Sequence, residues 1–191
     1  MQTSSRSGIF YALTAFTLWA IAPIYFKEMS FVPAQEVLAH RVIWSCILVL
    51  VLIVILRYTE ALKTVLQSRK VLLAMLGSTL LIGLNWGTFI WAVQNNKMLI
   101  ASLGYYINPL ISILLGVIFF KETLDRVKKA AVALCFCAVV FEVIQFGSLP
   151  WIALILAISF GFYGLIRKKI AVDSFTGMAI ETAFMLPIAL I

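Results

Sequence analysis

The sequence predicts an all-α polytopic membrane protein with seven transmembrane helices and a cytoplasmic N-terminus. Three observations support this class: 63% of the 191 residues are hydrophobic, the mean hydropathy is +1.08, and the apolar residues come in long blocks. Soluble domains carry only about 45–50% apolar residues. About 20 consecutive apolar residues let a helix cross the ~30 Å hydrocarbon core of a membrane. The lipid bilayer is therefore the expected main partner of this chain.

Seven apolar segments divide the chain. They cover residues 8–26, 34–56, 71–93, 98–120, 130–146, 150–166 and 174–191. The first segment is longer than the core of a secretion signal and ends without a small-residue cleavage pattern, so we expect it to remain as a span. The connection 57–70 is predicted to carry a short amphipathic helix along the membrane interface.

Basic residues set the predicted orientation. Twelve of the fifteen Lys and Arg residues lie in the N-terminal tail or in the connections 57–70, 121–129 and 167–169, whereas the opposite side has only Lys27 and Lys97. Such an excess in short loops marks the cytoplasmic side. Topology therefore accounts for the net charge of +7, and no basic stripe with interleaved aromatic residues indicates nucleic-acid binding.

An internal repeat is a further prediction. A shift of about 141 residues sets the first segment over the sixth and lays His40 over Glu181. A unit of five helices is odd-numbered, so its second copy enters the membrane inverted, as in many transporters. We predict a first five-helix repeat over 8–146 and the first two helices of an inverted second repeat over 150–191. Because the sequence ends at Ile191 within an apolar segment, we expect a fragment of a ten-helix protein.

The fourth segment carries an unusual polar centre. It has 23 residues without a charge, yet Tyr105, Tyr106, Asn108 and Pro109 lie near its middle. Pro109 lacks an N–H and its ring crowds the carbonyl of Tyr105, which loses its helical partner. Backbone freed at this depth must face protein or a water-filled cavity. We therefore predict a kink here that lines a solute path.

Four segments place polar or aromatic side chains in one layer of the membrane. At 1.5 Å per residue from the outer helix ends, the depths are roughly 10 Å for Trp19, Arg41 and Tyr105, roughly 12 Å for Asn85, and roughly 15 Å for Asn108 and Trp44. His40 and Trp44 are four residues apart and share a helix face. These residues, together with Pro109 and Glu181, are the candidate lining of a substrate pathway.

Each candidate also has a structural interpretation. Arg41 is costly in hydrocarbon and by default marks function, but it would also cap free carbonyls or reach outward to the headgroups. His40 fits either a structural hydrogen bond or proton handling. Asn85 and Asn108 would equally join helices by hydrogen bonds. Glu181, seven residues into the last segment, is the better acidic candidate for function.

No enzyme signature competes with transport. The chain has no HExxH, GxSxG or Walker A motif and no Cys/His spacing typical of a metal site, and it has a single His. We therefore expect no enzymatic activity, no cofactor and no metal. Without a nucleotide site, transport would run downhill or be driven by a gradient.

The run ASLGYYINPLISILLGVIFFKETLDRVKKAAVAL resembles drug/metabolite transporters of the EamA type. In these proteins a proline in the fourth helix is followed by a glycine and by a glutamate just past the helix end, which are here Pro109, Gly116 and Glu122. The segments NWGTFIWAV and GYYINP are closer still to RarD-type permeases, often labelled chloramphenicol-sensitivity proteins. The resemblance covers essentially the whole chain.

The resemblance implies ten helices in two inverted five-helix repeats. It also implies a bacterial inner-membrane permease for small organic solutes, with chloramphenicol as the named substrate. By this resemblance, positions that are characteristic of the family are occupied here by Arg41, Pro109 and Glu122. Two departures are alanine at 130 or 131, where a glycine is usual, and the absence of the last three helices. The expected mechanism is alternating access by rocking of the two repeats.

The main alternative is a membrane protein that transports nothing, such as a truncated helper or assembly subunit. Its polar layer would then join helices, and substitutions at Asn85 or Asn108 would lower thermal stability without changing solute binding. Self-association of two such chains into one complete pathway is a further alternative.

Overall fold

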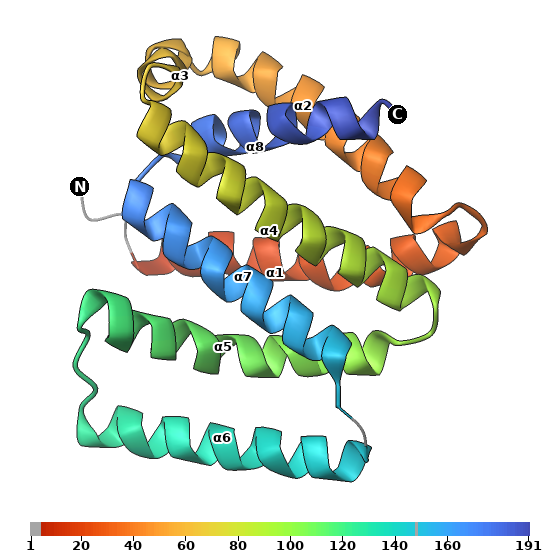
Figure 1. The fold of residues 1–191 in the computed structure, drawn as a ribbon, viewed down its shortest axis with the longest axis vertical. Coiled ribbons are helices and arrows are strands. Elements are labelled where there is room, and N and C mark those ends of the chain that lie inside the picture. Colours follow the sequence, from red (N-terminus) through yellow and green to blue (C-terminus); the bar gives the residue numbers. More distant parts are fainter. Residues whose placement is uncertain (1–4, 148) are drawn as a thin grey trace.

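The computed structural model describes residues 5–147 and 149–191, and this part of the chain is all helical, with no strand. The helices are α1 Ser5–Glu28, the 3₁₀ turn η1 Met29–Phe31, α2 Ala34–Ile55, α3 Thr59–Leu66, α4 Arg69–Gln94, α5 Met98–Phe120, α6 Arg126–Phe146, α7 Trp151–Ile170 and α8 Ser174–Ala189. Figure 1 shows α4 and α7 crossing the middle of the molecule, with α2, α3 and α8 at one end and α5 and α6 at the other.

Local chemistry explains several of the helix ends. The carboxylates of Asp125 and Asp173 accept hydrogen bonds from the backbone N–H groups of Lys128 and Thr176 at 2.8 and 2.9 Å, and so cap the N-termini of α6 and α8. At the end of α5, Lys121 takes the left-handed conformation with φ 54°, which stops the helix. These ends lie outside or at the edge of the apolar segments.

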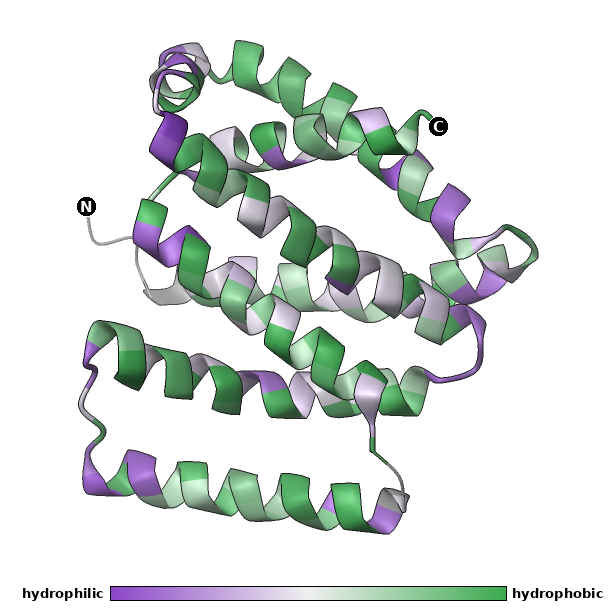
Figure 2. Ribbon diagram, viewed as in Figure 1, coloured by the Kyte–Doolittle hydropathy of each residue, from purple (hydrophilic) through white to green (hydrophobic). Residues whose placement is uncertain are grey.

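Each of the seven apolar segments contains a helix, and the predicted short helix of the connection 57–70 is confirmed as α3. By length and composition, five helices of the described part can cross a membrane: Ser7–Phe31, α2, α4, α5 and α7. The helix α8 is apolar but shorter. Most residues within the helices are apolar, and many of the hydrophilic residues lie near helix ends and in connections (Figure 2). The all-helical class is confirmed, while the seven-span count and the cytoplasmic N-terminus stay predictions.

Helix packing is most extensive between α5 and α7, between α4 and α7, and between α2 and α8. At Gly104 the backbones of α5 and α7 come close, because a Cβ there would lie 3.0 Å from the Ala153 carbonyl oxygen. The helices α1 and α7 run in opposite directions, as do α2 and α8 (Figure 1). An inverted repeat requires these directions, and the division into repeats stays a prediction.

Candidate solute pathway

A central cavity of about 460 Å³ lies between four helices from separate parts of the chain. Its lining residues are Ala15, Phe16 and Trp19 of α1, Ile82, Asn85 and Trp86 of α4, Gly104, Tyr105 and Asn108 of α5, and Leu156, Phe160 and Tyr163 of α7. The wall is mostly apolar and aromatic with a few polar groups, which is typical of small-molecule sites.

Two aromatic side chains of this cavity, Trp19 and Tyr105, contact each other and share a buried neighbour, Phe89. The indole N–H of Trp19 donates to the Tyr105 hydroxyl oxygen at 3.2 Å. The Trp19 ring stacks on Phe89 at 6.4 Å between centroids, and Phe89 meets Tyr105 edge to face at 5.9 Å. These contacts tie α1, α4 and α5 together and hold the rings in place. Because Trp19 and Tyr105 remain 41% and 43% exposed, they offer aromatic surface to a solute.

Asn85 and Asn108 differ in whether their side-chain amide hydrogens already have partners within the protein. Asn85 is 6% exposed, and its amide nitrogen donates to the Leu156 carbonyl at 2.9 Å and to the Ser159 hydroxyl at 3.0 Å. Both of its amide hydrogens therefore join α4 to α7, as in the structural interpretation. The side-chain oxygen of Asn108 accepts from Ser112 at 3.0 Å, so the Asn108 amide hydrogens remain for a solute.

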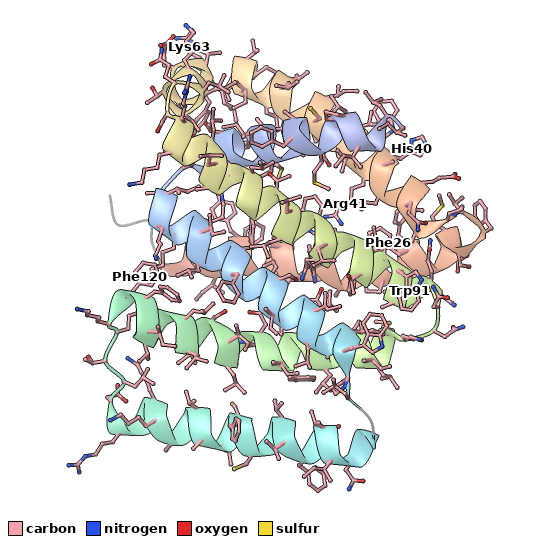
Figure 3. The ribbon with its side chains drawn as sticks, viewed as in Figure 1. Phe26, His40, Arg41, Lys63, Trp91 and Phe120 are labelled. Carbon is pink, nitrogen blue, oxygen red and sulfur yellow. The ribbon has the colours of Figure 1, made fainter. Side chains whose placement is uncertain are left out.

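Arg41 extends the polar layer beyond the central cavity. Its guanidinium carbon lies 4.0 Å from the centroid of the Trp86 ring, a cation–π contact. Among the described residues no carboxylate lies within 4.0 Å of this guanidinium. Figure 3 shows Arg41 on the side of α2 that faces α4, with His40 on the outer side. A cation without a carboxylate partner favours solutes that carry hydrogen-bond acceptors or negative charge.

Two further hollows lie in a row beside the central cavity. The first, of about 370 Å³, shares Trp19 and Asn85 with the central cavity and adds Arg41. The second, of about 550 Å³, shares Arg41 with the first and adds His40 and Trp44 beside η1. Shared lining residues therefore place the three hollows next to one another, from the centre of the molecule to the end predicted to face outward.

The structure places Pro109 away from the central cavity. Pro109 lines another hollow, between α5 and α6, which shares Tyr105 with the central cavity, and α5 passes through this position as one helix of 23 residues. The residues of the same stretch that line the central cavity are Gly104, Tyr105 and Asn108. At this stretch the neighbours of the proline therefore line the central cavity, and the solute path itself stays a prediction.

Glu181 also lies outside the central cavity, in a cluster that the sequence did not reveal. It is 5% exposed, and its carboxylate lies 2.8 Å from the Ser78 hydroxyl, 3.3 Å from the Tyr163 hydroxyl and 3.9 Å from Nε of Arg167. The sequence predicts Arg167 only as a loop charge that sets topology. In the structure it belongs to the last turn of α7. The four-residue spacing of Tyr163 and Arg167 shows in the sequence that they share a helix face, but it does not point to Glu181.

The motif residues Gly116 and Glu122 contact each other at the end of α5. A Cβ at Gly116 would lie 2.8 Å from Oε2 of Glu122, so glycine leaves room for the carboxylate. Oε1 of Glu122 accepts from the ammonium of Lys168 at 2.6 Å and links α5 to α7. Both side chains are half exposed, and such pairs contribute at most about 1 kcal/mol.

The cavity offers groups for binding a solute. Within residues 5–147 and 149–191, no three His, Cys, Asp or Glu side chains gather as a metal site. The aromatic wall and the Asn108 amide of the cavity provide stacking and hydrogen bonding, and the Arg41 guanidinium of the neighbouring hollow provides positive charge. This arrangement supports recognition of a small solute.

Residues 6–144 match the family model of the EamA-like transporter family. The chain belongs to this family. Protein RarD of Escherichia coli (strain K12) is 52% identical over 187 residues, which are 98% of this chain and 63% of that protein. An uncharacterized transporter of Vibrio cholerae is 48% identical over 190 residues, 100% of this chain and 63% of that protein. A chloramphenicol-sensitive protein RarD of Pseudomonas aeruginosa is 33% identical over 190 residues, 97% of this chain and 64% of that protein.

No solved structure matches the chain. This EamA-like chain spans about 63% of the length of the curated relatives that it matches. The family and the apolar helices make it a multi-pass membrane protein, and the resemblance to RarD-type EamA transporters is confirmed. The family match ends at residue 144, so Phe160 and Tyr163, which line the cavity from α7, lie beyond it.

Proposed function

We propose that the complete protein is a permease of the bacterial inner membrane that moves small organic solutes by alternating access without ATP. The observation that carries this proposal is the central cavity of about 460 Å³ with the neighbouring hollow lined by Arg41. Pockets for drug-sized ligands have volumes of about 300–1,000 Å³. The bacterial relatives support a bacterial membrane as its location, and the transporter family supports transport as its role.

The lining favours an aromatic solute with polar substituents. Trp19 and Tyr105 supply ring surface, and the Asn108 amide supplies hydrogen-bond donors. Arg41 supplies a cation that attracts acceptor groups. Chloramphenicol, which appears in the name of one relative, has an aromatic ring and polar substituents, and we take it as the probe.

Polar contacts at both ends of the helix bundle support a rocking motion. At one end the Lys27 ammonium donates to the Asn96 side chain at 2.7 Å, and at the other the Lys168 ammonium donates to Glu122 at 2.6 Å. Exposed contacts of this kind contribute little stability, so they open at small cost. With the predicted cytoplasmic N-terminus, the Glu122 contact lies at the cytoplasmic end and the Lys27 contact at the outer end.

Counterflow of radiolabelled chloramphenicol into vesicles that contain the complete protein tests the proposal. Vesicles preloaded with unlabelled chloramphenicol are expected to take up the label faster than vesicles without protein. Removing the Trp19 ring by Trp19→Ala should weaken apparent affinity about 2- to 12-fold, because an aromatic contact contributes about 0.5–1.5 kcal/mol. Trp151→Ala is the matched control, since Trp151 lies outside the central cavity. Equal uptake with and without protein would contradict transport of chloramphenicol and favour a structural helper.

A further inference from the structure

A buried carboxylate cluster lies beside the central cavity, and Tyr163 is the member of it that also lines that cavity. It consists of Glu181 of α8, Ser78 of α4, and Tyr163 and Arg167 of α7. Glu181 is 5% exposed and Ser78 is fully buried. An acidic side chain at such depth is expensive in a membrane protein and by default marks function.

The partners of this carboxylate suit both of its protonation states. The Ser78 hydroxyl lies 2.8 Å from Oε1 of Glu181 and 2.9 Å from the Met75 carbonyl, and it has one hydrogen for these two acceptors. With ionised Glu181, that hydrogen points to the carboxylate. With protonated Glu181, the carboxyl O–H donates to the Ser78 oxygen, and Ser78 donates to Met75. No buried polar group loses its partner in either state.

Arg167 is held back from a close ion pair. Its Nη2 lies 3.4 Å from the Val172 carbonyl and 3.3 Å from the Asp173 carbonyl, and its guanidinium packs against Gly177. These contacts leave Nε 3.9 Å from Glu181, beyond hydrogen-bond distance. The carboxylate therefore keeps a nearby positive charge, while its hydrogen bonds come from hydroxyl groups.

Tyr163 connects this cluster to the central cavity. Its side chain lines the cavity, and its hydroxyl lies 3.3 Å from Oε2 of Glu181. The charged and titratable groups acting on the carboxylate are Tyr163 and Arg167, both from α7. From α4 it receives only the Ser78 hydroxyl, and no group of α2 is among its partners in the described ranges. A solute that displaces the Tyr163 side chain thus changes the hydrogen bonding of Glu181 directly.

We propose that Glu181 is a proton-binding site whose occupancy is coupled to solute movement through Tyr163. One proton from one aqueous face adds to the carboxylate, and the same proton leaves to the other face later in the cycle. No bond of the solute forms or breaks. The coupling rests on the proposed transport function, whereas proton binding by the cluster does not depend on it.

Two measurements on the complete protein test this. The first is the number of protons moved per chloramphenicol in vesicles that contain a trapped pH-sensitive dye. The ratio is expected near one for the unmodified protein and for Glu142→Gln, whose carboxylate is exposed on α6, and near zero for Glu181→Gln and Tyr163→Phe. Chloramphenicol movement without protons in the unmodified protein, or unchanged ratios in both cluster variants, would overturn the coupling.

The second measurement is the infrared difference spectrum between high and low pH, which detects the carbonyl band of a protonated carboxyl group. The band of a buried carboxyl is expected in the unmodified protein, in Glu142→Gln and in Tyr163→Phe, and it should vanish in Glu181→Gln. An unchanged band in Glu181→Gln would overturn the proton site. If the band behaves as expected but chloramphenicol does not move, the proposed transport fails while the proton site stands.

Discussion

Replacing Gly104 with alanine is expected to force α5 away from α7. The new Cβ would lie 3.0 Å from the Ala153 carbonyl oxygen, 3.3 Å from the Ala153 Cα and 3.0 Å from the Leu156 Cβ. Ordinary van der Waals contact begins near 3.4 Å, so the two helices must separate by about 0.4 Å. Two of these atoms are backbone, which cannot rotate aside as the end of a flexible side chain does.

The expected cost is about 1–3 kcal/mol, the usual range for an added methyl group in a tightly packed interior. For 150–250 residues that corresponds to a fall of about 2–12 °C in Tm, and the longer complete protein should lie toward the lower end of this range. Heating the purified complete protein in detergent and following tryptophan fluorescence measures it. Because Gly104 lines the central cavity, chloramphenicol binding should weaken as well.

Gly164→Ala on α7 is the matched control, because no atom lies within 4 Å of a Cβ there. Its Tm should stay equal to that of the unmodified protein or rise slightly, since alanine favours helix. If Gly104→Ala melts at the same temperature as Gly164→Ala, the close backbone approach of α5 and α7 is refuted, and with it the shape of the cavity wall.

Two further predictions concern the polar layer. Arg41→Ala should abolish chloramphenicol flux while membrane insertion stays intact. Arg41→Lys should lower the apparent affinity for chloramphenicol about 2- to 5-fold, because lysine keeps the charge but loses the planar contact with Trp86. Equal flux in Arg41→Ala and the unmodified protein would exclude a role of Arg41 in transport. Asn85→Ala removes two hydrogen bonds to α7 and should cost about 1 kcal/mol of stability in thermal unfolding. A large loss of chloramphenicol affinity at unchanged Tm would contradict the structural role of Asn85.

The sequence predicts how deep each residue of the polar layer lies in the membrane. It does not predict in which direction around the helix axis the side chain points. Counting residues from the helix ends places Trp19 and Tyr105 at one depth, and the structure joins them by a hydrogen bond. Pro109 lies only one residue beyond Asn108, yet the two line different hollows, because successive residues point about 100° apart around a helix. Which of these directions meets a cavity depends on the neighbouring helices.

The sequence predicts a functional role for Glu181 but not the residues that it contacts. Its position within the last segment marked it for function. Its hydrogen-bond partners, however, lie 103 and 18 residues away in the chain, and its charged neighbour Arg167 is predicted from the sequence only as a loop charge that sets topology. No local pattern predicts contacts between segments so far apart.

The sequence by itself determined the all-helical membrane class and the residues that are costly to bury. Both follow from local physics: the hydrocarbon thickness sets the length of an apolar helix, and each charged or amide side chain has its own desolvation cost. Only the tertiary structure decided that Arg41 lies over Trp86, that Asn85 joins α4 to α7, and that Glu181 has hydroxyl partners. Lipid-facing helix surfaces are almost uniformly apolar in sequence, so the rotation of each helix about its axis is set by close contacts such as that of Gly104 with Ala153.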